Sequence, residues 1–578
     1  PKPGDARPGE QRVDFCAFAF PGSIHPTGHT LLRSFERDVS CRWNYQYGPV
    51  RFSRELILVR HRNEALVRYR VSGHTPGTRL ELRPLAALRD FHDLLSSKNR
   101  VTFAVLAGQD NAEIVRDRFR LRIACDRGCF VQDREWWYNF EYARDRERGQ
   151  DCTEDLFSPG RFVIEFPGDQ NPAGEMVVEL RATLSLDGPI YSPASAPSNV
   201  TFQEAHAAET ARLASISTRV VSTVRARRPL NADEERTLRS LSAAADQFIV
   251  LRDMPQSPPS TADSAAAPVS PAAVSPRSTT VIAGYPWFSD WGRDTMISLP
   301  GLLLATGRLD EAGQALETFA ALTRKGLVPN CFDNGSGMAE YNTVDASLWY
   351  LHAAAAYRRT AMAAGQRDPV SETSPIRRAC LAIIDAYLNG TDYHIRVDPA
   401  DGLVAAGDPG TQLTWMDAKR DGVVFTPRHG KPVEINALWY SGLLEIAELV
   451  EPDRPRTARE LRQHAHIVAR SFRDKFWNSR ESCLFDVLAP AAGGHWLPIA
   501  DIRPNQIFAV SLPHSPLTEP QQEGVLRTVR EHLLTPMGLR TLSPRDKKYT
   551  GRFGGTLFER DRAYHNGTVW PWLLGPYA

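Results

Sequence analysis

The sequence predicts a mixed α and β protein in which an antiparallel β-sandwich is followed by a ring of helical hairpins. With 578 residues the chain is too long for one ordinary hydrophobic core, so two or three domains are expected. Apolar and polar residues alternate from Val13 to about Leu186, whereas from about Thr201 apolar residues recur every three or four positions. We therefore expect a β domain over residues 1–200 and a helical domain over residues 201–578.

The first domain is predicted to consist of strands with one solvated face. Apolar side chains alternate with arginines in segments 67–71 and 118–123, and leucines flank a glutamate in segment 80–82. Turn signals such as Pro76-Gly77 separate these segments. Several alternating strands in succession are typical of an antiparallel β-sandwich, in which each sheet turns its apolar face toward the other.

The second domain is predicted to be a succession of helices joined by long loops. A run rich in Pro, Ser and Ala at 254–280 interrupts it, and this composition predicts a disordered insertion. Polar and aromatic motifs fall in the loops or at helix starts, so we expect a site at one mouth of the ring. Apolar residues at helical spacing mark 202–225, 231–251, 309–322, 343–360, 375–389, 434–450, 457–476, 504–511 and 519–534, and a further helix opens near Tyr564.

Charge and composition narrow the class of partner. Lys and Arg total 69 against 68 Asp and Glu, a net charge of +1, which favours a neutral polymer over nucleic acid or an anionic membrane. No apolar run approaches the ~18 residues that a membrane span needs. Among eight cysteines only Cys125 and Cys129 are close, and no second pair or histidine stands at zinc-ligand spacing. We therefore expect reduced thiols, a cytoplasmic location and no metal. The motifs of phosphate-binding loops, zinc hydrolases and serine hydrolases are absent from the sequence.

The segment from Trp287 to Pro300, WFSDWGRDTMISLP, carries the strongest local signal. Trp291 stands beside Arg293 and Asp294 at the start of a helical pattern. Sugars are held in this way, because an aromatic face packs against the C–H surface of the ring while charged groups bond its hydroxyls. The alternative interpretation is a buried salt bridge at a helix N-terminus without a ligand.

Two further loops carry carboxylates next to aromatic residues. Tyr341 and Asp345 lie in EYNTVD before a predicted helix, where Asp345 also suits the first helical turn without any ligand. Asp417 lies in TWMDA directly after Trp415 and Met416. Aromatic shielding raises the pKa of a carboxyl, so Asp417 is a candidate general acid. An ordinary turn hydrogen bond is the alternative role for Asp417.

The last two motifs lie at predicted helix starts. Glu434, in GKPVEINALWY, stands in a first turn, where it favours the helix dipole with or without a substrate. His565 and Trp570 lie in YHNGTVWPW, another aromatic cluster with a histidine and an amide. The alternative for this cluster is a helix start that faces the core and contains a hydrogen-bonded histidine.

Together these segments resemble the amylo-α-1,6-glucosidase family, the glucosidase component of glycogen debranching enzymes in its bacterial and archaeal form. The resemblance rests on AGYPWFSDWGRDTMISLPGL, EYNTVDASLWYLHA, TWMDAKRDG, GKPVEINALWYSGL and YHNGTVWPWLLGPY in this order, and NFEYARDRERGQDCTEDLFSPGRF resembles the family's β-sandwich domain. It implies an α+β multidomain fold with an (α/α)6 barrel after the sandwich. It also implies hydrolysis, with inversion and without a cofactor, of α-1,6-linked glucose at the branch stubs of glycogen or another branched α-glucan.

The resemblance also implies roles for single residues. Asp417 matches the family's general acid, and Arg293 and Asp294 match the pair that holds the hydroxyls of the departing glucose. The family's general base is a glutamate well after the WPW motif, so the resemblance implies a base beyond Ala578 and a chain whose last helices are missing. The positions that we expect to bind substrate are Trp291, Arg293, Asp294, Tyr341, Asp345, Trp415, Glu434, His565 and Trp570.

Two other functions stay open at this stage. A related (α/α)6 glycosidase would act on a small glucoside such as trehalose, and a non-catalytic glycan-binding protein would keep the aromatic residues without a base. Within the chain, Glu340, Glu434 and Glu559 are the glutamates that we considered for the base. Of these, Glu434 is the least unfavourable, although sugar binding suits it better.

Overall fold

The computed structural model describes two units, each with its own hydrophobic core. The first reaches to Thr218 and the second begins at Arg219, so the boundary falls inside helix α2 (Phe202–Arg225). Of the predicted insertion at 254–280, residues 254–276 lie outside the described residues, while residues 277–280 belong to strand β15 (Arg277–Gly284). The described residues are 11–91, 93–99, 101–166, 174–186, 198–253, 277–332 and 339–578.

The first unit is built on two antiparallel sheets. One has eight strands in the order β3-β4-β5-β6-β13-β10-β9-β8, and the other has three in the order β11-β12-β7. Apolar side chains from both sheets share one core, including Phe52 and Ile114 from the first and Phe130 and Phe162 from the second. The strands of the larger sheet are β3 (Leu32–Arg37), β4 (Cys41–Tyr47), β5 (Val50–Leu58), β6 (Glu64–Ser72), β13 (Met176–Leu186), β10 (Phe119–Cys125), β9 (Asn111–Arg116) and β8 (Ala104–Ala107); those of the smaller are β11 (Cys129–Glu141), β12 (Thr153–Glu165) and β7 (Arg79–Leu82).

The alternation in the sequence corresponds to the two faces of these strands. In β6 and β13, Val67 lies opposite Leu180 and Arg68 lies opposite Glu179. The Arg68 guanidinium forms an ion pair with the Glu179 carboxylate at 2.8 Å. Arg68 lies on the face predicted to be solvated, but its side chain is only 12% exposed, and its ion pair links β6 to β13.

The second unit is mainly helical, which confirms the predicted mixed α and β class. Its helices begin where the sequence supplies caps: Asn231 forms a capping box with Glu234, and Ser374 caps a helix that has Pro375 in its first turn. The helices of this unit are α3 (Ala232–Gln247), α4 (Gly292–Leu299), α5 (Leu309–Leu322), α6 (Asp345–Ala363), α7 (Pro375–Asn389), α8 (Val433–Val450), α9 (Pro455–Phe476), α10 (Phe508–Ser511), α11 (Glu519–His532), α12 (Leu557–Tyr564) and α13 (Leu574–Tyr577).

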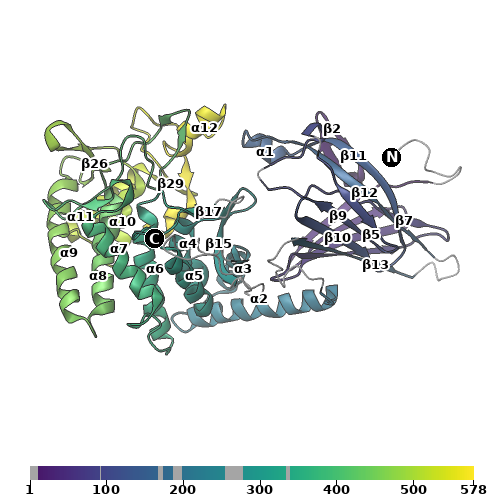
Figure 1. Cartoon of the computed structure of the whole chain (residues 1–578), viewed down its shortest axis with the longest axis horizontal. Helices are drawn as coiled ribbons and strands as arrows, with labels where there is room; N and C mark the ends of the chain where they lie inside the picture. Colours follow the sequence, from purple (N-terminus) through teal and green to yellow (C-terminus); the bar gives the residue numbers. More distant parts are fainter. Residues whose placement is uncertain are drawn as a thin grey trace, which may run out of the picture. The chain divides into compact units, whose positions relative to one another are not determined.

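These helices fall into a central and a peripheral set. Helices α4, α6, α8 and α10 contact one another in that order, while α7, α9 and α11 pack beside α6, α8 and α10, respectively. Helix α8 is buried over most of its surface, as expected of a central element, whereas α9 buries only one side. Figure 1 shows α8 and α9 side by side. The predicted helix at 504–511 is a 3-10 turn (Pro504–Ile507) followed by the short α10. Among the described residues, no helix combines the length and the apolar character that crossing a bilayer requires.

Candidate active site

Arg293 joins three segments that are far apart in the sequence. It lies in the first turn of α4 and is only 6% exposed. Its Nε donates to Asp345 Oδ1 at 2.8 Å, and its Nη1 donates to Asp417 Oδ2 at 3.3 Å. Its Nη2 lies 3.4 Å from Thr343 Oγ1. The guanidinium therefore brings together the start of α4, the start of α6 and the loop that carries Asp417.

Asp345 offers an unused acceptor inside this cluster. The residue lies in the first turn of α6 and is 1% exposed. Its Oδ1 accepts from Arg293 and, at 2.6 Å, from the Thr343 hydroxyl. Its Oδ2 is buried and has no hydrogen-bond partner among the described residues. Because a buried carboxylate oxygen without a partner is unfavourable, this atom suits a ligand that brings a hydroxyl donor.

Asp417 is in an environment that favours its protonated form. Its side chain is 35% exposed, more than that of Asp345. Burial raises the pKa of Asp417, the charge of Arg293 opposes this rise, and the charge of Asp345 reinforces it. Burial also raises the pKa of the neighbouring carboxyl Asp294, again against the effect of Arg293. The two carboxyls therefore hold their protons at a higher pH than exposed aspartates.

Trp415, two residues before Asp417, belongs to a cluster with His565, Trp570 and Trp572 that we call the aromatic wall. Trp415 is 8% exposed, and its ring meets those of His565, Trp570 and Trp572 edge-on, with centroids 5.4, 5.5 and 5.3 Å away. The Trp570 ring stacks on His565 at 5.6 Å. The TWMDA loop and the YHNGTVWPW segment, which the sequence suggested separately, therefore form one cluster.

His565 is the most polar member of this wall and is almost fully buried. It is 1% exposed, and neither ring nitrogen has a hydrogen-bond partner among the described residues. Burial lowers the pKa of His565 well below its ordinary value, and the nearby charges of Arg503, Arg293 and Arg428 lower it further. The imidazole is therefore neutral near pH 7, with one donor and one acceptor to offer.

The carboxylate of Glu434, which the sequence predicts to bind the sugar, is hydrogen-bonded to a buried arginine. Glu434 is 2% exposed, and both of its carboxylate oxygens accept from the guanidinium of Arg428. Arg428 also donates from Nε to Asp486 Oδ2 at 3.0 Å. Asn505 Nδ2 donates to Asp486 Oδ1 at 2.8 Å, and Asn505 Oδ1 accepts from the Trp415 indole at 2.8 Å. The carboxylate of Glu434 is thus engaged by Arg428, and its effect on the aromatic wall passes through this network.

The residues of this network other than Glu434 and Trp415 were missed by the sequence analysis. Burying Glu434 in an apolar helix requires a cationic partner. The chain has 69 Lys and Arg, however, and nothing in the local pattern singles out Arg428. Asp486 and Asn505 lie in segments without a recognisable motif, so only the three-dimensional structure brings them to Trp415.

The remaining predicted residues lie around α4 and α6. Trp291 is the N-cap residue of α4, and its ring meets that of Phe288 edge-on at 6.3 Å. The Tyr341 hydroxyl donates to the carbonyl of Leu322 at 2.8 Å, so backbone already uses this donor.

Of the other glutamates considered for the base, Glu340 is exposed on strand β18 (Ala339–Glu340). Glu559 accepts from the backbone N–H and the hydroxyl of Thr556 and so caps α12.

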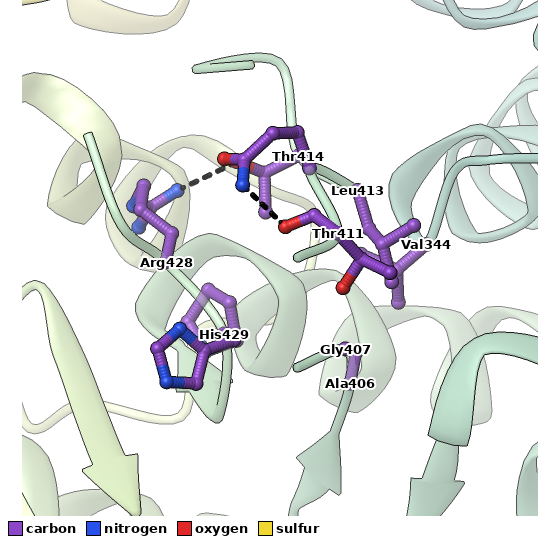
Figure 2. Close-up of a pocket in the computed structure, with 10 residues that line it drawn as sticks. Val344, Ala406, Gly407, Thr411, Leu413, Thr414, Arg428 and His429 are labelled. Carbon is purple, nitrogen blue, oxygen red and sulfur yellow. Dashed lines mark hydrogen bonds between the residues drawn. The ribbon is translucent and has the colours of Figure 1, made fainter. Parts of the chain in front are cut away.

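A small pocket lies beside the loop that leads to Asp417. Figure 2 shows Thr411, Leu413 and Thr414 facing Arg428 and His429 across it. An Arg428 Nη1 to Thr414 Oγ1 contact of 3.5 Å crosses the pocket edge. The described residues that line the pocket include Arg428 but none of the predicted site residues. The pocket therefore adjoins the network that links Glu434 to Trp415.

The comparisons with known proteins agree with the resemblance seen in the sequence. The family described as amylo-alpha-1,6-glucosidase matches residues 243–578, and the one described as glycogen debranching enzyme N terminal matches residues 7–172. A glycogen debranching enzyme of Saccharomyces cerevisiae is 26% identical over 383 residues, which cover 51% of this chain and 25% of the yeast protein. The chain thus spans about a quarter of the length of that curated relative.

One solved structure extends the comparison. A bacterial glucoamylase complexed with acarbose matches with a TM-score of 0.48 and 12% sequence identity, over 94% of this chain and 76% of that chain. The family match alone spans more than half of the chain and contains every residue predicted for the site. The chain therefore belongs to the amylo-α-1,6-glucosidase family.

Proposed function

We propose that the chain is an inverting glycoside hydrolase that releases glucose from the α-1,6-linked branch stubs of glycogen or limit dextrin. The observation that carries the proposal is the convergence of Arg293 on Asp345 and Asp417 beside the aromatic wall of Trp415. Family membership and the glucan-acting relative support it. The fold belonging to this function is a β-sandwich over 1–200 followed by an (α/α)6 barrel over 201–578, which the central and peripheral helix sets support.

In this proposal Asp417 is the general acid. Burial raises the pKa of Asp417, which favours the proton that an acid must deliver to the leaving oxygen. Arg293 and Asp294 hold the hydroxyls of the glucose. Asp345 Oδ2, which has no hydrogen-bond partner in the described part of the chain, accepts a hydrogen bond from a further hydroxyl. The rings of Trp291, Trp415 and Trp570 then pack against the sugar's C–H surface.

Inversion also requires a general base. A second carboxylate activates a water molecule on the opposite face of the sugar, with about 6.5–9.5 Å between the two carboxyl groups. Glu434 is a poor candidate because Arg428 engages both of its oxygens, and Glu559 is a poor candidate because it caps α12. We assign the base to neither, and we give Glu434 a positioning role toward Trp415.

The test is glucose release from a phosphorylase-trimmed limit dextrin, measured for this chain and for the protein that its gene encodes. Replacing a general acid lowers the rate by about 10²–10⁴-fold, so Asp417→Asn should fall in that range. Asp421→Asn is the matched control, because Asp421 is exposed and its φ of 51° is one that asparagine adopts readily. Glucose release that survives Asp417→Asn, or release from trehalose but not from dextrin, would refute the proposal.

A further inference from the structure

Three exposed apolar side chains lie close together in the sequence, one just before α12 and two in its first turn. These are Phe553, Leu557 and Phe558, which are 43%, 42% and 39% exposed. Single exposed apolar residues need no explanation, but a group that includes two phenylalanine rings is a candidate binding surface. We call these three residues the aromatic rim.

One end of the rim is connected to Asp417 through a hairpin at 419–424. The ring of Phe558 meets that of Phe425 edge-on, with centroids 5.0 Å apart. The backbone N–H of Phe425 donates to the carbonyl of Ala418 at 3.3 Å, and Ala418 directly follows Asp417 in the chain. Phe558 is therefore linked to the candidate acid through the ring of Phe425 and the base of the 419–424 hairpin.

The other end of the rim is connected to the aromatic wall. Phe553 contacts Tyr564 with ring centroids 6.0 Å apart, and Tyr564 contacts Trp570 at 5.0 Å. Trp570 in turn contacts Trp415. A continuous series of ring contacts thus leads from the buried wall of the site to the exposed Phe553.

Local hydrogen bonds hold the rim in place. Thr556 and Glu559 form a capping box at the start of α12, and Arg420 in the hairpin forms an ion pair with Asp561 on that helix. Asn566 Nδ2 donates to the carbonyl of Phe425 at 3.2 Å. A surface that is ordered before it binds loses less conformational entropy on binding, so these contacts favour the rim as a preformed site.

We propose that the aromatic rim binds the α-1,4-linked chain from which the branch stub is released. The inference rests on the proposed function, because a general acid stands at the oxygen of the leaving group and the leaving group here is that chain. Side chains next to Asp417 that face solvent therefore contact the departing chain, and the glucose is held on the side of Arg293 and Asp345. Aromatic faces suit the C–H surfaces of successive glucose units.

The test measures binding of maltoheptaose, a linear α-1,4 oligosaccharide that has no branch to hydrolyse, by titration calorimetry on this chain. The double variant Phe553→Ala with Phe558→Ala removes two aromatic contacts and should weaken binding about tenfold. Ile467→Ala is the matched control, because Ile467 is 49% exposed on α9 and should leave binding unchanged. Circular dichroism of the unaltered chain and of both variants verifies that the variants keep the fold.

The outcomes separate the rim from the proposed function. Binding that is absent in the unaltered chain, or equal in the double variant and the unaltered chain, overturns the rim, whatever the dextrin assay shows. Loss of binding in the double variant supports the rim, even if no form of the protein releases glucose. If the double variant loses binding and no form of the protein releases glucose, the glycosidase proposal is refuted and the aromatic rim is a glucan-binding surface only.

Discussion

Arg293 Nη1 lies 3.3 Å from Asp417 Oδ2, although the two residues are 124 positions apart in the sequence. The same guanidinium donates to Asp345, so one buried cation stands between two carboxyl groups. Its charge lowers the pKa of Asp417, whereas burial and the charge of Asp345 raise it. The balance of these three effects keeps Asp417 protonated to a higher pH than an exposed aspartate. Substitutions of Arg293, Asp345 and Asp417 should therefore have different effects on stability and on activity.

Removing the cation should destabilise the second unit. Arg293→Met leaves Asp345 buried without its ion-pair partner, and breaking a buried pair in this way destabilises a protein by about 3–5 kcal/mol. Urea unfolding followed by tryptophan fluorescence measures the change. The double variant Arg293→Met with Asp345→Asn should recover part of the loss, because the unpaired charge is then gone.

Arg456→Met is the matched control for this experiment. Arg456 is 87% exposed in its side chain and pairs with Glu460 on the surface of α9. Surface pairs of this kind contribute little to stability. If Arg293→Met and Arg456→Met lose the same free energy of unfolding, the buried ion pair between Arg293 and Asp345 does not stabilise the protein.

Removing the charge of Asp345 should shift the pH profile of glucose release. The negative charge of Asp345 raises the pKa of Asp417, so Asp345→Asn lowers that pKa. A general acid works only while it is protonated, so its activity is lost as pH rises through its pKa. The alkaline limb of kcat/KM for limit dextrin should therefore move to lower pH in Asp345→Asn. A limb that stays in place or moves to higher pH excludes Asp417 as the group that this limb reports.

Glu434→Gln distinguishes the network from a direct contact with the sugar. Glutamine keeps the shape of the side chain but removes the charge that Arg428 bonds, and hydrogen bonds to charged groups contribute about 1.5–3 kcal/mol to stability. We expect a loss of that size in urea unfolding, together with weaker glucose release as Trp415 loses its support. Glu451→Gln, which alters an exposed pair with Arg462, is the control and should leave stability unchanged. If Glu434→Gln instead raises KM and leaves the free energy of unfolding unchanged, the result would support direct contact between Glu434 and the sugar.

The sequence was informative wherever local pattern decides structure. The predicted helices at 309–322, 375–389 and 434–450 correspond to α5, α7 and α8, because their apolar spacing and helix starts are both written in neighbouring residues. The motifs around Arg293 and Asp417 were also visible, because charged and aromatic residues stand side by side in them. Their meeting in one cluster depends on how the helices pack, and no single segment contains that information.

The network behind Trp415 shows what local pattern leaves out. Asn505 accepts from the indole of this tryptophan and donates to Asp486, although the three residues lie in separate segments of the sequence. Tyr341 gives a second example, since its hydroxyl donates to the carbonyl of Leu322, a contact that the local sequence does not reveal. Whether a polar side chain is engaged or available is a property of its three-dimensional neighbours.

The buried imidazole of His565 should make stability depend on pH. Its pKa lies well below that of a histidine in the unfolded chain, which is about 6.5. As pH falls below about 6.5, the imidazole binds a proton in the unfolded state but stays neutral in the folded state. The free energy of unfolding therefore falls by about 1.4 kcal/mol per pH unit. His565→Phe keeps an aromatic ring beside Trp415 and Trp570 and removes this titration. The free energy of unfolding of the variant relative to the unaltered chain should rise by about 2 kcal/mol between pH 7 and pH 5. His466→Phe, at an exposed position of α9, controls for the loss of a histidine, and an equal rise in both variants would contradict a neutral, buried His565.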